Sequence, residues 1–151
     1  TSRRTFLSTA TSITNKDFKK VFENCEPDSN VLILDVREDE DLNNTFLPEY
    51  NLSGTKMNIK RIPILDLVEM EIDPIKDYRD SHTIFCVCRA GNKSVTATRI
   101  LELHGYNTIN VHGGMADLGK VMDLVKDGKH VFPIAESFDS VYFANRTLCS
   151  F

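Results

Sequence analysis

The segment 83–111 constrains the fold most, because its pattern alternates strand, helix and strand. Residues 83–88 are mainly apolar and favour a β-strand, residues 93–104 favour a helix, and residues 108–111 favour another strand. Gly105 follows the expected helix, where a left-handed residue commonly ends one. A strand–helix–strand unit with a short return forms a right-handed parallel crossover. The chain is therefore expected to be an α/β protein with a parallel sheet.

The rest of the chain supports this class. A helix is expected from Thr14 or Asn15 to about Asn24, and a strand covered on both faces over residues 31–36. The remaining expectations are a polar loop over 37–50, a short strand within 54–59, a helix over 62–70, a charged connection over 74–80, a helix over 115–126 ended by Asp127-Gly128, and an edge strand over 131–134.

Composition restricts the partners of the chain. Its 151 residues suit one domain, and its net charge of −4 argues against a dedicated nucleic-acid surface. No apolar stretch is long enough to cross a bilayer. The four cysteines show no paired spacing, and Cys86 and Cys88 are too close to be zinc ligands from one knuckle. We therefore expect reduced thiols in an intracellular protein, of the cytoplasm or mitochondrion, with no metal, cofactor, membrane or nucleic-acid partner.

The two ends of the chain differ from its middle. Residues 1–12 contain Arg3 and Arg4 and no acid, and no hydrophobic core region follows them, so an export signal is not expected. We assign residues 1–12 to a leader and residues 13–134 to the domain. Residues 135–151 are too apolar for a disordered tail, and we expect this extension to pack on the domain or on a partner.

The loop after the strand 83–88 carries the chemistry. A thiol at a strand–helix junction faces backbone N–H groups and the positive end of a helix dipole, and nearby cations add to that field. These conditions favour the nucleophilic thiolate. The sequence predicts Cys88 as the nucleophile and the following residues as an anion-binding loop: Cys88-Arg89-Ala90-Gly91-Asn92-Lys93-Ser94. We interpret Cys86 as a core residue and the acidic run 38–41 as a solvated loop.

Three segments in register resemble the rhodanese-like, or sulfurtransferase, family. The loop after Cys88 is similar to the family's active-site loop of Cys-Arg-x-Gly-x-basic-Ser type, and this match is the most specific. The other two are Leu34-Asp35-Val36-Arg37-Glu38, which is similar to a strand ending in Asp-x-Arg, and Gly105-Tyr106 followed by Val111-His112-Gly113-Gly114. The segment Asn51-Leu52-Ser53-Gly54-Thr55 departs from the family's usual Gly-His-Ile-x-Gly-Ala stretch. The resemblance implies a central, mostly parallel five-stranded sheet flanked by helices on both faces.

The resemblance also implies an activity. Cys88 would accept a sulfane sulfur from thiosulfate or another persulfide donor and pass it to a thiol or cyanide. Arg89 and Lys93 would attract the anionic donor, and the loop amides would hold the persulfide sulfur. Ser94 would either donate a hydrogen bond to the Cys88 sulfur or cap the following helix. A protein could serve as the sulfur donor or acceptor.

Other functions compete with this reading. A cysteine phosphatase needs an arginine six positions after its cysteine to clamp phosphate, and Ser94 stands there instead. Arsenate reduction uses a related cradle and stays open. A rhodanese-like protein-binding or regulatory module without turnover is the alternative from another class. Such modules typically lose the loop cysteine, which this chain keeps.

Overall fold

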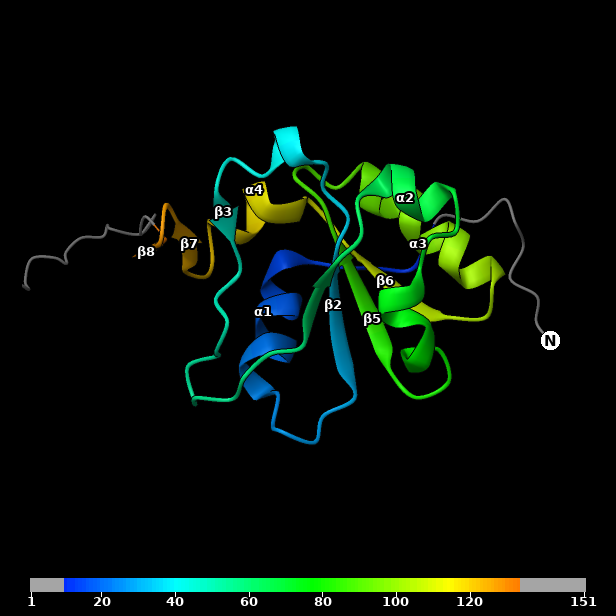
Figure 1. The fold of residues 1–151 in the computed structure, drawn as a ribbon. Coiled ribbons are helices and arrows are strands. Elements are labelled where there is room, and N and C mark those ends of the chain that lie inside the picture. Colours follow the sequence, from blue (N-terminus) through cyan, green and yellow to red (C-terminus); the bar gives the residue numbers. More distant parts are fainter. Residues whose placement is uncertain (1–9, 134–151) are drawn as a thin grey trace, which may run out of the picture.

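The computed structural model describes residues 10–133, which fold around a five-stranded parallel sheet (Figure 1). Every neighbouring pair of strands in this sheet runs parallel. The expected fold class is confirmed. In spatial order the strands are β1 (Ser12–Ile13), β6 (Asn107–Val111), β5 (Thr83–Val87), β2 (Val31–Asp35) and β4 (Ile59–Arg61).

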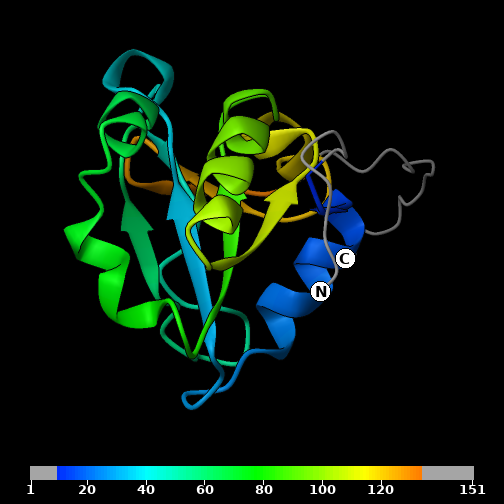
Figure 2. The same ribbon diagram turned by 90° about the vertical axis from the view of Figure 1, so that its right-hand side faces the viewer.

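Helices cover both faces of the sheet. One face carries α1 (Asn15–Asn24) and α4 (Gly114–Leu118), and the other carries α2 (Ile64–Val68) and α3 (Lys93–Leu103), as the two views in Figures 1 and 2 show. Thr14 caps α1 as expected, because its side-chain oxygen accepts a hydrogen bond from the backbone N–H of Asp17. Within residues 10–133, none of the helices combines the length and apolar character that a membrane span requires.

Alternation along the central strands divides the core into two layers. Ile33 and Phe85 pack under α1 with Phe18, whereas their neighbours Leu34 and Cys86 face the opposite layer with α2 and α3. All of these side chains are at most 4% exposed. A strand buried on both faces needs this uninterrupted run of apolar residues, because successive side chains point to opposite sides.

The helix expected over 115–126 is wrong beyond Leu118. The chain instead forms a second, antiparallel sheet of β3 (Thr45–Phe46), β7 (Leu124–Lys126) and β8 (Lys129–Val131). Asp127 and Gly128 have φ of 52° and 79°, which gives the left-handed turn that joins tight hairpins. The same Asp-Gly pair had been interpreted as the end of a helix.

Other boundaries also differ from the expectation. The short strand expected within 54–59 corresponds to β4, which starts only at Ile59. The edge strand expected over 131–134 corresponds to β8, which already begins at Lys129. β1 was not expected; it lies at the edge of the sheet beside β6. The polar connections contain two 3₁₀ turns, η1 (Asp39–Asp41) and η2 (Asp73–Tyr78). Residues 1–9 and the extension 135–151 lie outside the described residues.

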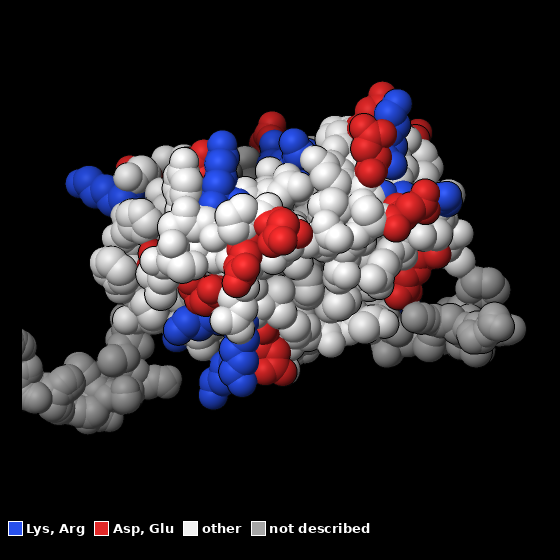
Figure 3. All heavy atoms as spheres, turned by 90° about the horizontal axis from the view of Figure 1, so that it is seen from below, with Lys and Arg blue, Asp and Glu red and all other residues white. Residues whose placement is uncertain are grey.

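The amino ends of the central strands lie at the bottom of Figure 1. Seen from this side in Figure 3, acidic and basic side chains are intermingled on the surface. The carboxyl ends of the same strands meet at the opposite edge of the sheet, at the top of Figure 1, together with η1. That edge is where parallel α/β sheets place their binding sites.

Asn51 holds the C-terminal end of α1. Its amide nitrogen donates hydrogen bonds to the carbonyls of Phe22 and Cys25, both at 3.0 Å, and its carbonyl oxygen accepts from the backbone N–H of Thr55 at 2.9 Å. Asn51 is 6% exposed. This residue opens the segment that departs from the family pattern. Its side chain supplies a donor to the Cys25 carbonyl and a second donor to the Phe22 carbonyl, which also accepts from the Cys25 N–H at 3.4 Å.

We predict that Asn51→Ala lowers the free energy of unfolding by about 1–3 kcal/mol, because it leaves the buried Cys25 carbonyl without a donor and removes one of the two donors to the Phe22 carbonyl. Urea denaturation followed by circular dichroism measures the change. The control is Asn107→Ala, which removes an exposed hydrogen bond to Thr83 Oγ1 and should change the stability by less than about 0.5 kcal/mol. Equal midpoints for the two variants would contradict this role for Asn51.

Candidate functional site

Residues 88–94, here called the cysteine loop, connect the carboxyl end of β5 to α3. Cys88 directly follows β5, and α3 begins at Lys93. Arg89, Ala90 and Asn92 are exposed, as is Lys93. Cys88 itself is only 2% exposed and belongs to the core layer under α2 and α3. The loop therefore lies over its own cysteine.

Two groups contact the Cys88 sulfur directly. The backbone N–H of Gly91 donates to Sγ at 2.9 Å, and the thiol donates to Ser94 Oγ at 3.3 Å. Gly91 has φ of +96°, a left-handed conformation that turns its amide toward the sulfur. A Cβ at this position would lie 2.7 Å from the backbone nitrogen of Gly113, so a side chain is excluded.

Ser94 continues this contact into the sheet. Its side chain is fully buried, and its hydroxyl donates to Oδ1 of Asn110 on β6. The amide of Asn110 in turn donates to Ser12 Oγ at 3.2 Å. The N-cap position of α3 is Asn92, so Ser94 does not cap this helix. Ser94 contacts the sulfur, but the expected direction is reversed, because the thiol donates to the Ser94 hydroxyl. Sequence reasoning missed Asn110, although a polar residue between apolar neighbours in a strand is a usable signal.

The helix α4 holds the backbone of the cysteine loop. The N–H of Met115 donates to the Cys88 carbonyl at 2.8 Å, and that of Ala116 donates to the Arg89 carbonyl at 3.0 Å. Gly114 has φ of +61°, and a Cβ there would lie 2.3 Å from the Cys88 carbonyl oxygen. Glycine is thus needed at position 114 because two backbones approach each other closely there.

Asp41 of η1 contacts both cations of the cysteine loop. Its Oδ2 lies 2.9 Å from Lys93 Nζ, and its Oδ1 lies 3.5 Å from Arg89 Nε. The hydrogen bond from Lys93 lowers the pKa of Asp41, and the same hydrogen bond raises the pKa of Lys93. The interpretation of the acidic run 38–41 as a solvated loop is therefore wrong for Asp41, whose side chain is 21% exposed.

A buried ion pair fixes the chain that leads to and follows Asp41. Arg37 is 2% exposed and donates to Asp35 Oδ2 at 2.8 Å, to the Thr45 carbonyl at 2.7 Å and to the Leu42 carbonyl at 3.2 Å. The guanidinium of Arg61 also donates to the carbonyl of Arg37 at 3.0 Å. Arg37 thus ties the end of β2 to the loop that carries η1, which is a structural role.

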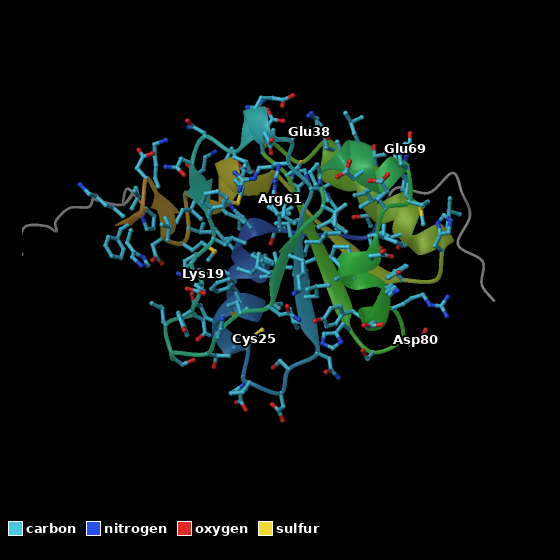
Figure 4. The ribbon with its side chains drawn as sticks, in the orientation of Figure 1. Lys19, Cys25, Glu38, Arg61, Glu69 and Asp80 are labelled. Atoms are coloured by element: carbon cyan, nitrogen blue, oxygen red, sulfur yellow. The ribbon has the colours of Figure 1, made fainter. Side chains whose placement is uncertain are left out.

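The acidic turn is held from the side of β4 and α2 as well. Arg61 forms an ion pair with Asp39 at 2.6 Å, and Glu38 Oε2 accepts a hydrogen bond from the Leu65 backbone N–H at 2.9 Å. Glu38 and Arg61 both lie in the upper part of Figure 4, at the carboxyl edge of the sheet. These contacts place Asp41 beside the cysteine loop.

The other cysteines lie in the core. Cys86 is fully buried, and burial raises its pKa to about 12. Cys25 is 6% exposed and lies near the bottom of Figure 4, at the end of the sheet opposite to the cysteine loop; burial raises its pKa too. Cys86 occupies the core position expected for it, and Cys25 packs in the other core layer. Cys149 lies outside the described residues.

Comparison with known proteins agrees with this arrangement. The sequence model of the rhodanese-like domain family matches residues 14–120. The Bacillus subtilis (strain 168) protein YtwF, whose name describes it as a putative sulfurtransferase, is 31% identical over 93 residues, which cover 62% of this chain and 78% of YtwF.

Solved structures show the same fold. SSP1007 from Staphylococcus saprophyticus is 28% identical, with a TM-score of 0.53, and the match covers 72% of this chain and 92% of that protein. A rhodanese-like domain protein from Staphylococcus aureus is 25% identical, with a TM-score of 0.56, and the match covers 82% and 99% of the two chains.

We predict that Gly114→Ala destabilises the protein by at least about 2 kcal/mol more than Gly128→Ala does. Both glycines have a positive φ, but a Cβ at Gly128 meets nothing within 4 Å, whereas one at Gly114 meets the Cys88 carbonyl. Urea denaturation of the two variants gives the comparison. Equal losses would mean that only the backbone conformation matters at Gly114.

Proposed function

The chain belongs to the rhodanese-like domain family, and we propose that it is a sulfurtransferase that carries a sulfane sulfur on Cys88. The observation that supports this most is the position of the thiol. Cys88 Sγ lies at the end of a central strand and accepts a hydrogen bond from the Gly91 amide at 2.9 Å. A sulfur that forms and loses a negative charge needs such a fixed donor.

The reaction would proceed in two displacements. The Cys88 thiolate attacks the outer sulfur of a donor such as thiosulfate, the sulfur–sulfur bond of the donor breaks, and sulfite leaves with the electron pair. In the second step, cyanide or the thiolate of an acceptor attacks the outer sulfur of the Cys88 persulfide. The products are thiocyanate or an acceptor persulfide, and the Cys88 thiolate is restored. Both steps balance without an added oxidant or reductant.

The surrounding groups would assist these steps through charge and position. The amino end of α3, which begins at Lys93, points its positive dipole toward the cysteine loop. Arg89 and Lys93 lie at the surface of this loop, where they can meet an anionic donor or the leaving sulfite. Gly91 supplies the hydrogen bond that remains available to the sulfur when the thiol ionises.

Burial of the sulfur sets a condition on this mechanism. Because Cys88 is 2% exposed, only a small part of this residue is open to a donor in this structure. The same burial favours the second candidate function, a rhodanese-like module that binds a protein partner without turnover. The acceptor in the first case is a small thiol or a protein thiol.

We predict that Cys88→Ser lowers thiocyanate formation from thiosulfate and cyanide at least about 1000-fold, because the serine hydroxyl is not ionised at neutral pH. The control is Cys86→Ala, which should keep activity. After exposure to thiosulfate without acceptor, mass spectrometry should find a gain of about 32 Da on Cys88.

The matched cysteine sharpens this test. Burial raises the pKa of Cys86 to about 12, so this thiol is neutral between pH 6 and 9. It should therefore carry no added sulfur in the folded protein. If the wild-type protein shows neither turnover with several donors nor a mass increase on Cys88, the binding module becomes the better description.

A further inference from the structure

We propose that the Asp41 carboxylate competes with an anionic sulfur donor for the two cations of the cysteine loop, Arg89 and Lys93. In this way it selects sulfur donors by their charge. This inference rests on the proposed sulfur transfer. It names the residue that sets donor class, and this residue lies 47 positions before Cys88 in the sequence, in a different turn of the chain.

The geometry resembles that of a bound anion. One oxygen of Asp41 contacts Lys93 at 2.9 Å and the other contacts Arg89 at 3.5 Å, so a single carboxylate bridges both cations. Arg89 directly follows Cys88, and Lys93 is the first residue of α3. An oxyanion on a sulfur donor approaching Cys88 would meet the same two cations. It would have to share them with Asp41 or displace it.

The surrounding charges strengthen this competition. Glu38 and Glu40 also act electrostatically on Lys93, and Asp39 is paired with Arg61. The turn 38–41 therefore contributes four carboxylates at this edge of the sheet against three cations, those of Arg61, Arg89 and Lys93. The pKa of Asp41 is lowered, chiefly by the hydrogen bond from Lys93, so its carboxylate is ionised at neutral pH.

The charge of the donor determines how much this costs. The electrostatic repulsion from Asp41 is proportional to the donor's charge, so the repulsion energy of a dianion such as thiosulfate is twice that of a monoanion. Compared with the same site without this carboxylate, Asp41 therefore shifts the preference from thiosulfate toward singly charged donors, of the organic persulfide or thiosulfonate class.

The test compares Asp41→Asn with the wild-type protein on two donors that deliver the same sulfur. Thiosulfate carries two negative charges and methanethiosulfonate carries one. Removing the carboxylate should raise kcat/KM about threefold for methanethiosulfonate and about ninefold for thiosulfate, because doubling the interaction energy squares the ratio. Both gains should shrink as salt is added. Asp28→Asn, which changes the net charge equally but lies in the exposed turn before β2, at the opposite edge of the sheet, should change either value less than twofold.

A second readout does not depend on turnover. Iodoacetate and iodoacetamide both alkylate the Cys88 thiolate, but only iodoacetate is charged. The rate with iodoacetate divided by the rate with iodoacetamide therefore reports the local electrostatic field at Cys88 and not the extent of thiol ionisation. Asp41→Asn should raise this ratio about threefold. Peptide mass spectrometry assigns the modification to Cys88 rather than to another cysteine.

The outcomes separate the two proposals. A raised alkylation ratio without turnover in any variant would leave Asp41 as the competitor and remove sulfur transfer. Equal losses of kcat/KM with both donors and an unchanged alkylation ratio would mean that Asp41 only holds the loop, and would overturn this inference. If Cys88 reacts with neither alkylating agent and no donor is turned over, both proposals fail, because nothing then reaches the sulfur.

Discussion

The buried ion pair between Arg37 and Asp35 is the interaction on which the rest of the site depends. Arg37 is almost fully enclosed, and its guanidinium donates to the carbonyls of Leu42 and Thr45 as well as to Asp35. A guanidinium can serve three acceptors at once because its donors lie in one rigid plane. Without it, the Asp35 carboxylate would be buried without its counter-ion, and the turn that carries Asp41 would lose one of its attachments to the sheet.

The cysteine loop is consequently held in two different ways. On one side, backbone amides of α4 donate hydrogen bonds to the carbonyls of Cys88 and Arg89, which requires the two backbones to approach closely. On the other side, the carboxylate of Asp41 meets the charged ends of Arg89 and Lys93. The backbone contact is rigid and independent of salt, whereas the charged contact weakens as salt is added. The side of the loop that carries Arg89 and Lys93 is therefore the side whose attachment depends on salt.

Sequence patterns predicted the fold well wherever the structure of a residue is decided by its neighbours in the sequence. The strand ending at Val87, the helix from Lys93 and the glycine after it all follow from hydrophobic period and backbone preference. Asp41 could not be found in this way, because its partners are distant in sequence and an acidic run is usually solvated. The helix prediction for residues 119–126 is wrong because Val121, Met122 and Val125 fit a helical spacing. The pair Asp127-Gly128 forms a hairpin turn, but as a sequence it fits the end of a helix equally well.

The hydrogen bonds that run from the short strand β1 to the sulfur have a fixed direction. The Ala10 carbonyl can only accept, so Ser12 gives its proton to it, Asn110 gives an amide proton to Ser12, and Ser94 gives its hydroxyl proton to Asn110. Ser94 is left with lone pairs for its neighbour and no hydrogen. Loss of the thiol proton would therefore force the serine to rotate away from the asparagine, or leave the sulfur anion with a single amide partner.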